Sequence, residues 1–96
     1  MLTKDAIIEI ILKSLDEINK MNNSKIQLSV DTKLFGSNSS LDSLGFVNLI
    51  TSIEENIEEL TGNYIPIADE KAFSLESSPF KSVETLATFI ETLINE

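Results

Sequence analysis

The sequence predicts an all-α fold: a small four-helix bundle, made of three main helices and one short helix, with a long loop between the first and second helices. Three stretches carry this prediction, because apolar residues recur in each at spacings of three and four, the pattern of a helix that buries one face. The 96 residues suffice for one domain, residues 1–96, with a core of a few helices.

The first helix is expected over residues 3–21. Thr3 is a suitable N-cap, and Asp5 is favourably placed in the first turn. The run Met21-Asn22-Asn23-Ser24 ends the helix. Five apolar residues share its predicted core face: Ile7, Ile8, Ile11, Leu15 and Ile18.

Residues 25–40 are expected to form the long connection. Its scattered apolar residues are Ile26, Leu28, Val30, Leu34 and Phe35. The first three alternate with polar residues, as in a strand, but no second clear strand is available to pair with them. A loop pinned to the core is therefore the better interpretation, and it ends in the polar run Gly36-Ser37-Asn38-Ser39-Ser40.

The second helix is expected over residues 43–60, and Gly62 ends it as a left-handed C′ glycine does. Asp42 is its candidate N-cap, which places Ser43 in the first turn. A helix start combines partial positive charge with unpaired N–H donors, an environment that suits a bound or attached phosphate. The apolar residues of its predicted core face are Phe46, Ile50, Ile53, Ile57 and Leu60.

In the last third of the chain, the sequence predicts an extended connector over residues 63–67, a short helix over 68–73 and a loop over 74–80. Ser82 then caps a last helix over residues 83–94. Its residues at core spacing are Val83, Leu86, Ala87, Ile90, Leu93 and Ile94.

Composition and charge exclude several classes of function. Sixteen acidic residues against seven Lys and Arg give a formal charge of −9, which disfavours nucleic acid and anionic lipid and favours a basic protein partner. The chain has no Cys and no His, so the usual zinc clusters and Ser-His or Cys-His pairs cannot be built. Apolar runs fall far short of the ~20 residues that span a bilayer, and no signal-peptide pattern is present. We therefore expect a monomer in the cytoplasm, with no metal site and no membrane insertion.

The second helix and its surroundings are strongly acidic. No Lys or Arg occurs between Leu34 and Glu70. Any one of Glu54, Glu55, Glu58 and Glu59 has an ordinary role on a solvated face, since charge runs usually serve that purpose. As a group next to Ser43, they predict a docking surface that attracts and selects a basic partner.

The residues Asp42-Ser43-Leu44, followed by Val47, Leu49, Ile50, Ile53, Glu54 and Glu55, resemble the acyl carrier protein family around its modified serine. The resemblance continues through Ile65-Pro66 to the last apolar helix and thus covers roughly the whole chain. A triplet alone occurs by chance in many proteins, but length, acidity, helix order and the Ile-Pro position agree as well.

This resemblance implies a function. The family serine matching Ser43 carries a covalent 4′-phosphopantetheine arm, donated from coenzyme A by a phosphopantetheinyl transferase with Mg²⁺, and the thiol of the arm holds acyl groups as thioesters. The chain is then not an enzyme but a carrier that serves acyl-loading and acyl-transferring enzymes. Asp42 and Leu44 would flank the attachment point, and the candidate partner contacts are Leu44, Phe46, Glu54, Glu55 and Glu58. Core packing is the competing role for two of these residues. It is the stronger interpretation for Phe46, whereas packing and partner contact are equally supported for Leu44.

The sequence also departs from the family pattern. Gly45 stands where an acidic residue usually follows the serine, Asn48 stands where a glutamate is common, and the stretch between Pro66 and Val83 is longer than usual. These differences favour a specialised carrier, for a secondary metabolite, lipid or surface polysaccharide, over the carrier of ordinary fatty acid biosynthesis.

Two alternatives remain open, and two others fit poorly. A peptidyl or aminoacyl carrier would have nearly the same sequence. An unmodified acidic helical adaptor would bind a basic partner without any chemistry at Ser43. A serine hydrolase or a calcium-binding protein fits poorly, because the first lacks a base and the second lacks the acidic alternation of an EF-hand loop.

Overall fold

The computed structural model describes residues 3–23, 25–34, 41, 43–67 and 81–95, and within them the fold is all-α. Three helices are present: α1 spans Lys4–Asn22, α2 spans Ser43–Thr61 and α4 spans Val83–Ile94. In these ranges, β structure is limited to one isolated antiparallel bridge between Lys33 and Ser82. The short helix expected over residues 68–73 lies outside the described residues, as does Phe35.

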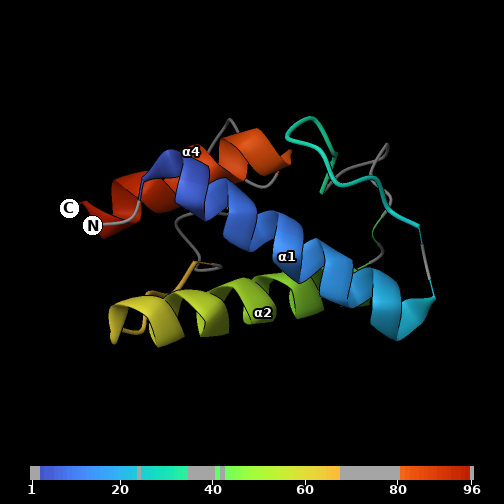
Figure 1. The fold of residues 1–96 in the computed structure, drawn as a ribbon, viewed down its shortest axis with the longest axis horizontal. Coiled ribbons are helices and arrows are strands. Elements are labelled where there is room, and N and C mark those ends of the chain that lie inside the picture. Colours follow the sequence, from blue (N-terminus) through green and yellow to red (C-terminus); the bar gives the residue numbers. More distant parts are fainter. Residues whose placement is uncertain (1–2, 24, 35–40, 42, 68–80, 96) are drawn as a thin grey trace.

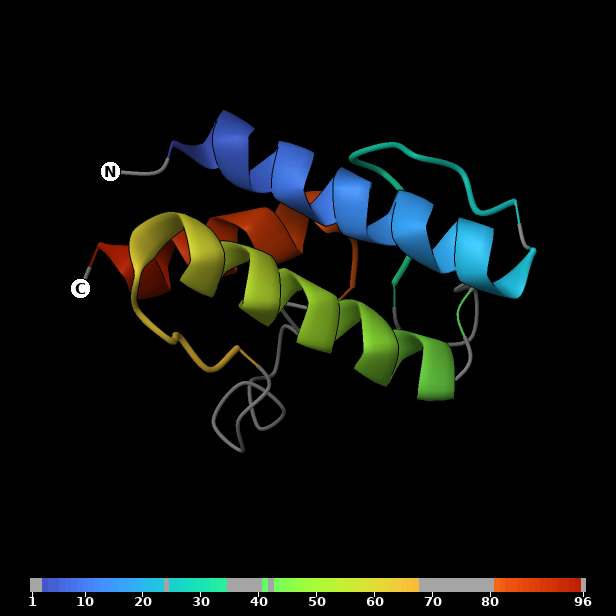
Figure 2. The ribbon, with the colours of Figure 1, turned by 60° about the horizontal axis from the view of Figure 1, so that its bottom comes forward.

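Helix α1 is the central element of the bundle and packs against both α2 and α4 (Figures 1 and 2). It runs antiparallel to α2, and the core is formed where the apolar faces of the three helices meet. A single polar side chain, Ser14, is buried among the described residues. Its hydroxyl donates to the carbonyl of Ile10 at 2.9 Å and accepts from the Asn56 side chain of α2 at 3.1 Å, so it joins the two helices.

Local capping chemistry explains where the helices begin and end. The Thr3 hydroxyl accepts a bond of 3.1 Å from a first-turn N–H of α1, and Ser82 forms a capping box with Thr85 at the start of α4. Asn23 and Gly62, which follow α1 and α2, both have left-handed backbone angles, with φ of 53° and 77°. These features confirm the predicted caps at Thr3, Ser82 and Gly62. The N-cap predicted at Asp42 lies outside the described residues.

The predicted core faces are largely confirmed, with a correction at the end of α2. Leu60 is expected in the core but is 63% exposed, because it lies in the last turn of α2 at an open groove between α1 and α2. Ile8 is only partly buried, as are Leu93 and Ile94. The structure adds Ile10 and Leu49 to the buried core.

The first connection, residues 25–34, is a loop pinned to the core, as predicted. Ile26 and Leu34 are its buried anchors, whereas Leu28 and Val30 are exposed. The side-chain amide of Asn19 both donates to and accepts from the peptide groups of Ile26, at 2.9 Å in each case. This pair of bonds ties the loop to the last turn of α1.

The same loop caps α4. The N–H groups of Val83 and Glu84 have no acceptor within the helix, and they donate to the carbonyls of Thr32 and Val30 at 3.2 and 3.0 Å. The N–H of Leu34 donates to the carbonyl of Lys81 at 3.1 Å. The chain that leads toward Ser43 is therefore fixed to the start of α4 by backbone bonds.

Within the described ranges, none of the three helices combines the length and the hydrophobicity of a membrane-spanning segment.

Candidate functional site

Ser43 is the first residue of α2. Leu41, just before it, is partly buried and packs against the core, and Gly45 and Phe46, just after it, are buried. The first turn of α2 contains no acidic side chain. A group attached at this position would thus meet the partial positive charge of a helix start without an opposing carboxylate in that turn.

The side of α2 that faces away from the core forms one continuous exposed stripe, which we call the outer face of α2. Its residues follow each other at spacings of three and four, which places them on one side of a helix. They are Leu44, Val47, Thr51, Glu55 and Glu58, all exposed. The stripe is apolar beside Ser43 and acidic toward the other end of α2.

For two residues, the sequence allowed both core packing and contact with a partner, and the structure gives them different environments. Leu44 is 70% exposed and belongs to the outer face, whereas Phe46 is 5% exposed and lies in the core. Phe46 therefore packs in this structure instead of facing a partner. The two positions differ because residues two apart lie on nearly opposite sides of a helix, and Phe46 is on the side that meets the core.

The glutamates of α2 also divide into two kinds. Glu55, Glu58 and Glu59 are exposed, but Glu54 is only partly exposed, and its carboxylate accepts a hydrogen bond of 2.7 Å from the backbone N–H of Ile67. The sequence predicted Glu54 as a partner contact and gave no sign of this second role, because the two residues are thirteen positions apart.

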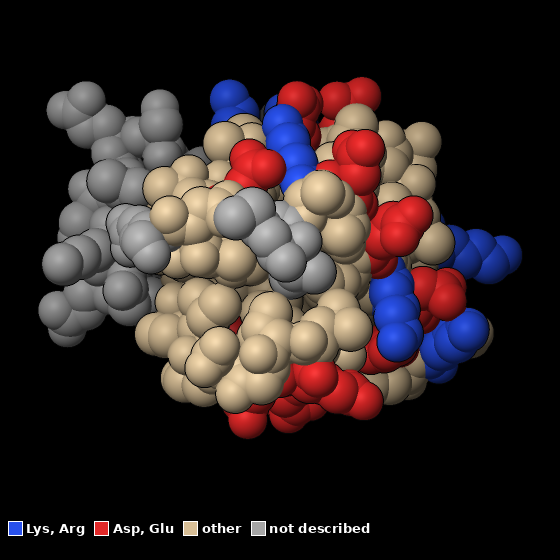
Figure 3. Space-filling view, turned by 60° about the vertical axis from the view of Figure 1, so that its left-hand side comes forward, with Lys and Arg blue, Asp and Glu red and all other residues tan. Residues whose placement is uncertain are grey.

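No lysine is available on α2 to balance these charges. The two ion pairs found in the described part of the chain, Lys4 with Glu84 and Lys20 with Asp16, involve α1 and α4 only. Figure 3 shows acidic atoms along the lower edge of the molecule, on the side of α2, and further acidic atoms beside lysines at the top and on the right of this view. The excess of negative charge that the sequence predicts around residues 54–59 is thus concentrated on a single helix, α2.

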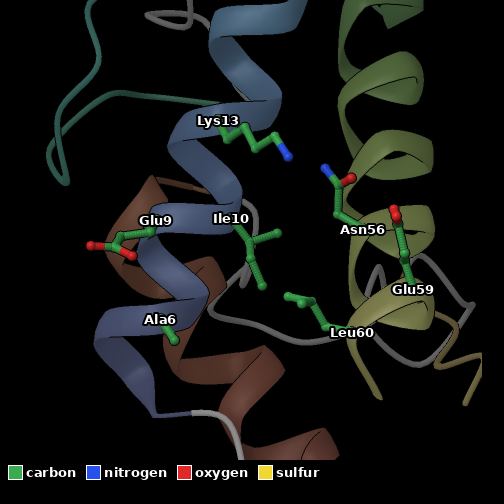
Figure 4. Close-up of a pocket in the computed structure, with 7 residues that line it drawn as sticks. All are labelled: Ala6, Glu9, Ile10, Lys13, Asn56, Glu59 and Leu60. Atoms are coloured by element: carbon green, nitrogen blue, oxygen red, sulfur yellow. The ribbon is translucent and has the colours of Figure 1, made fainter. Parts of the chain in front are cut away.

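A groove of about 490 Å³ lies between α1 and α2, at the end of α2 away from Ser43 (Figure 4). The side chains of Ile10 and Leu60 point toward one another across it, and Lys13 extends from α1 toward Asn56. Its other lining residues are Ala6, Glu9 and Glu59. Leu60 lies at this groove and not in the closed core, which the apolar spacing alone could not reveal.

Comparison with known proteins identifies no relative: no protein-family model matches the chain, and neither a curated protein nor a solved structure is significantly similar to it.

Proposed function

We propose that this protein is a phosphopantetheine-bearing acyl carrier, with the arm attached to the hydroxyl of Ser43. The observation that carries the proposal is the position of Ser43. The serine of the Asp42-Ser43-Leu44 motif is the first residue of α2, and the exposed Leu44 and Val47 follow it on the outer face. The order of a modifiable serine, an apolar contact patch and an acidic patch suits a carrier that several enzymes must recognise.

The start of α2 has a chemistry that fits the proposed group. Ser43 supplies the hydroxyl that would form the phosphodiester, and the helix start favours the resulting negative charge. Buried Gly45 adds no side chain next to the attachment point, and Leu44 lines the surface beside it. When attached, the group supplies a thiol on a flexible arm that can hold an acyl group as a thioester.

Ser43 is a passive acceptor in this proposal. No His or Cys exists in the chain to activate it, so the transferase, with Mg²⁺ and coenzyme A, would supply the activation. Tethering then makes each delivery of cargo an effectively intramolecular step with a raised local concentration. The carrier itself is not an enzyme, and we place it as a monomer in the cytoplasm.

The outer face of α2 is the proposed docking surface for the transferase and for the enzymes that load and unload the arm. Leu44 and Val47 would enter an apolar depression on the partner, and Glu55 and Glu58 would meet lysine or arginine side chains. Such charge complementarity mainly raises the encounter rate and selects partners, whereas desolvated apolar contacts contribute more to affinity.

The cargo is proposed only as a class. Gly45 and Asn48 make the region next to Ser43 less acidic than in the family it resembles, which supports a specialised pathway for a secondary metabolite, lipid or surface polysaccharide. A peptidyl or aminoacyl cargo fits the same attachment chemistry.

A second candidate function is an unmodified acidic adaptor. It is favoured by the outer face of α2, whose exposed apolar and acidic residues form a contact surface that needs no chemistry at Ser43. This candidate predicts that Ser43→Ala leaves function intact, while the carrier predicts complete loss.

The deciding experiment measures intact mass after incubation with a promiscuous phosphopantetheinyl transferase, Mg²⁺ and coenzyme A. The wild-type chain should gain one phosphopantetheine and Ser43→Ala should gain none. Ser52→Ala, at another serine of α2, is the matched control and should gain the same mass as wild type. Wild-type protein that stays unmodified with several transferases would exclude the carrier and favour the adaptor.

A further inference from the structure

Glu54 occupies a position between two parts of the molecule. It is next in sequence to Glu55 and four residues from Glu58, so its carboxylate borders the acidic end of the outer face. The same carboxylate holds the N–H of Ile67 at 2.7 Å. One charged group thus borders a surface for cationic partners and also secures a segment of the chain.

The secured segment is the connector of residues 62–67, which turns at the end of α2 and returns along it. It passes back over about two helical turns before it reaches the level of Glu54. Its last residue, Ile67, is fully buried in the core, while Tyr64 and Pro66 are exposed. Between residues 64 and 67, the bond from Ile67 to Glu54 is the hydrogen bond that ties the backbone to the rest of the described chain.

We propose that Glu54 couples the binding of cationic partners on the outer face of α2 to the position of this connector. A carboxylate that accepts a backbone N–H still attracts cations, and an arginine offers it several N–H donors in a planar fork. A partner guanidinium or ammonium group that takes up Glu54 competes with the single N–H of Ile67. The connector then loosens, and Ile67 loses the bond that orients it in the core.

This inference rests on the part of the proposed function that brings basic partners to α2, and it does not require the modification of Ser43. It gives Glu54 a positioning role that differs from the contact role of Glu55 and Glu58. Partner binding would therefore change the hydrogen bonding and position of Ile67 in the core, while the helix boundaries stay the same.

The test uses the full unmodified chain, a hexa-arginine peptide as the cationic probe, and NMR detection of amide hydrogen exchange at low ionic strength. The peptide should shift the amide signals of Glu55 and Glu58. It should also speed exchange at Ile67 about fivefold, the factor expected when one ordinary hydrogen bond is lost from a local opening equilibrium.

Two variants separate the coupling from simple charge binding. In Glu54→Gln the amide oxygen still accepts from Ile67 without a charge, so the peptide should change exchange at Ile67 by less than about twofold. In the double variant Glu55→Gln, Glu58→Gln, the bond from Ile67 to Glu54 is intact but the two exposed charges of the outer face are gone. The peptide should then bind weakly and leave Ile67 protected.

The inference is overturned if the peptide saturates the Glu55 and Glu58 signals of the wild type while exchange at Ile67 stays constant, or if it does not engage the face at all. Mass gain in the transferase assay with an unresponsive Ile67 would overturn the coupling alone. A responsive Ile67 in a protein that no transferase modifies would overturn the carrier alone.

Discussion

The two described connections of this bundle are held in different ways. Residues 25–34 are fixed by neutral groups: the amide of Asn19 clamps Ile26, and the carbonyls of Val30 and Thr32 cap α4. Past the turn at Gly62 and Asn63, residues 64–67 of the connector are held by one carboxylate bond, by the burial of Ile67 and by the packing of Ile65 against the core. Ions in the solvent barely affect the first set of bonds, whereas the second depends on a group that other charges can reach.

The first connection therefore belongs to the rigid part of the fold, and the second connection can adjust. The first connection shares hydrogen bonds with α1 and α4, so it should open only when much of the bundle opens. The second has few such bonds and should open locally, at a lower free energy than global unfolding.

The largest expected effects come from removing the buried anchors. Leu34→Ala and Ile67→Ala should each cost about 2–5 kcal/mol, because both side chains are fully buried. Chemical denaturation measures the cost, and amide exchange shows its distribution. Leu34→Ala should raise exchange in α4 as well, since the loop caps that helix, but Ile67→Ala should raise it mainly over residues 63–67. Equal spreading in both variants would refute the distinction.

Loss of the clamp on Ile26 should come next. Asn19→Ala removes one donor and one acceptor from a partly buried peptide and should cost about 2–3 kcal/mol in unfolding free energy. Asn19→Asp is the informative companion. It keeps the acceptor for the N–H of Ile26 but sets a carboxylate against the carbonyl of Ile26, so it should not restore stability. Full recovery with aspartate would show that the donor side of the clamp contributes nothing.

Glu54→Ala should cost less, about 1–2 kcal/mol, because it removes one partly exposed bond and leaves the N–H of Ile67 without its partner. Glu55→Ala, at the exposed neighbour, should stay within about 0.5 kcal/mol of wild type. Urea titrations of both variants measure the difference, and equal stabilities would remove the structural role assigned to Glu54.

The smallest effect concerns Gly62, the left-handed residue that follows α2. Gly62→Ala should cost about 1 kcal/mol, because a Cβ at φ of 77° strains the backbone although no atom lies within 4 Å of it. Gly62→Asn should cost less, since asparagine tolerates this conformation and Asn23 already adopts it after α1. Thermal unfolding distinguishes the two variants. An alanine that proved harmless would mean that the turn can relax to another conformation.

Much of the fold could be predicted because its determinants are local. Caps such as Thr3 and Ser82 act within three residues, and the spacing of apolar residues reports a helix face directly. The contacts that sequence reasoning missed, Ser14 with Asn56 and Glu54 with Ile67, join residues whose separation depends on how the elements pack. Leu60 was misplaced for a related reason, since its burial depends on how closely α1 and α2 pack at the groove between them.

The candidate site follows the same rule. The motif around Ser43 correctly placed that serine at the start of α2. Whether Leu44 packs or faces solvent could not be decided from spacing, because the first turn of a helix can lie past the edge of its neighbours. The bundle geometry resolved that question in favour of exposure.

Helix α2 contains no Lys or Arg to offset its glutamates, and this has an energetic consequence for the free protein. Glu54 and Glu58, and likewise Glu55 and Glu59, are neighbours on successive turns, where like charges repel by about 0.2–0.5 kcal/mol per pair. The C-terminal end of a helix carries partial negative charge, which opposes them further. In the isolated protein, the second half of α2 is thus slightly destabilised by repulsion between like charges. Added salt screens this repulsion, and a cationic partner neutralises it at the place where it binds. In both cases the second half of α2 becomes more stable.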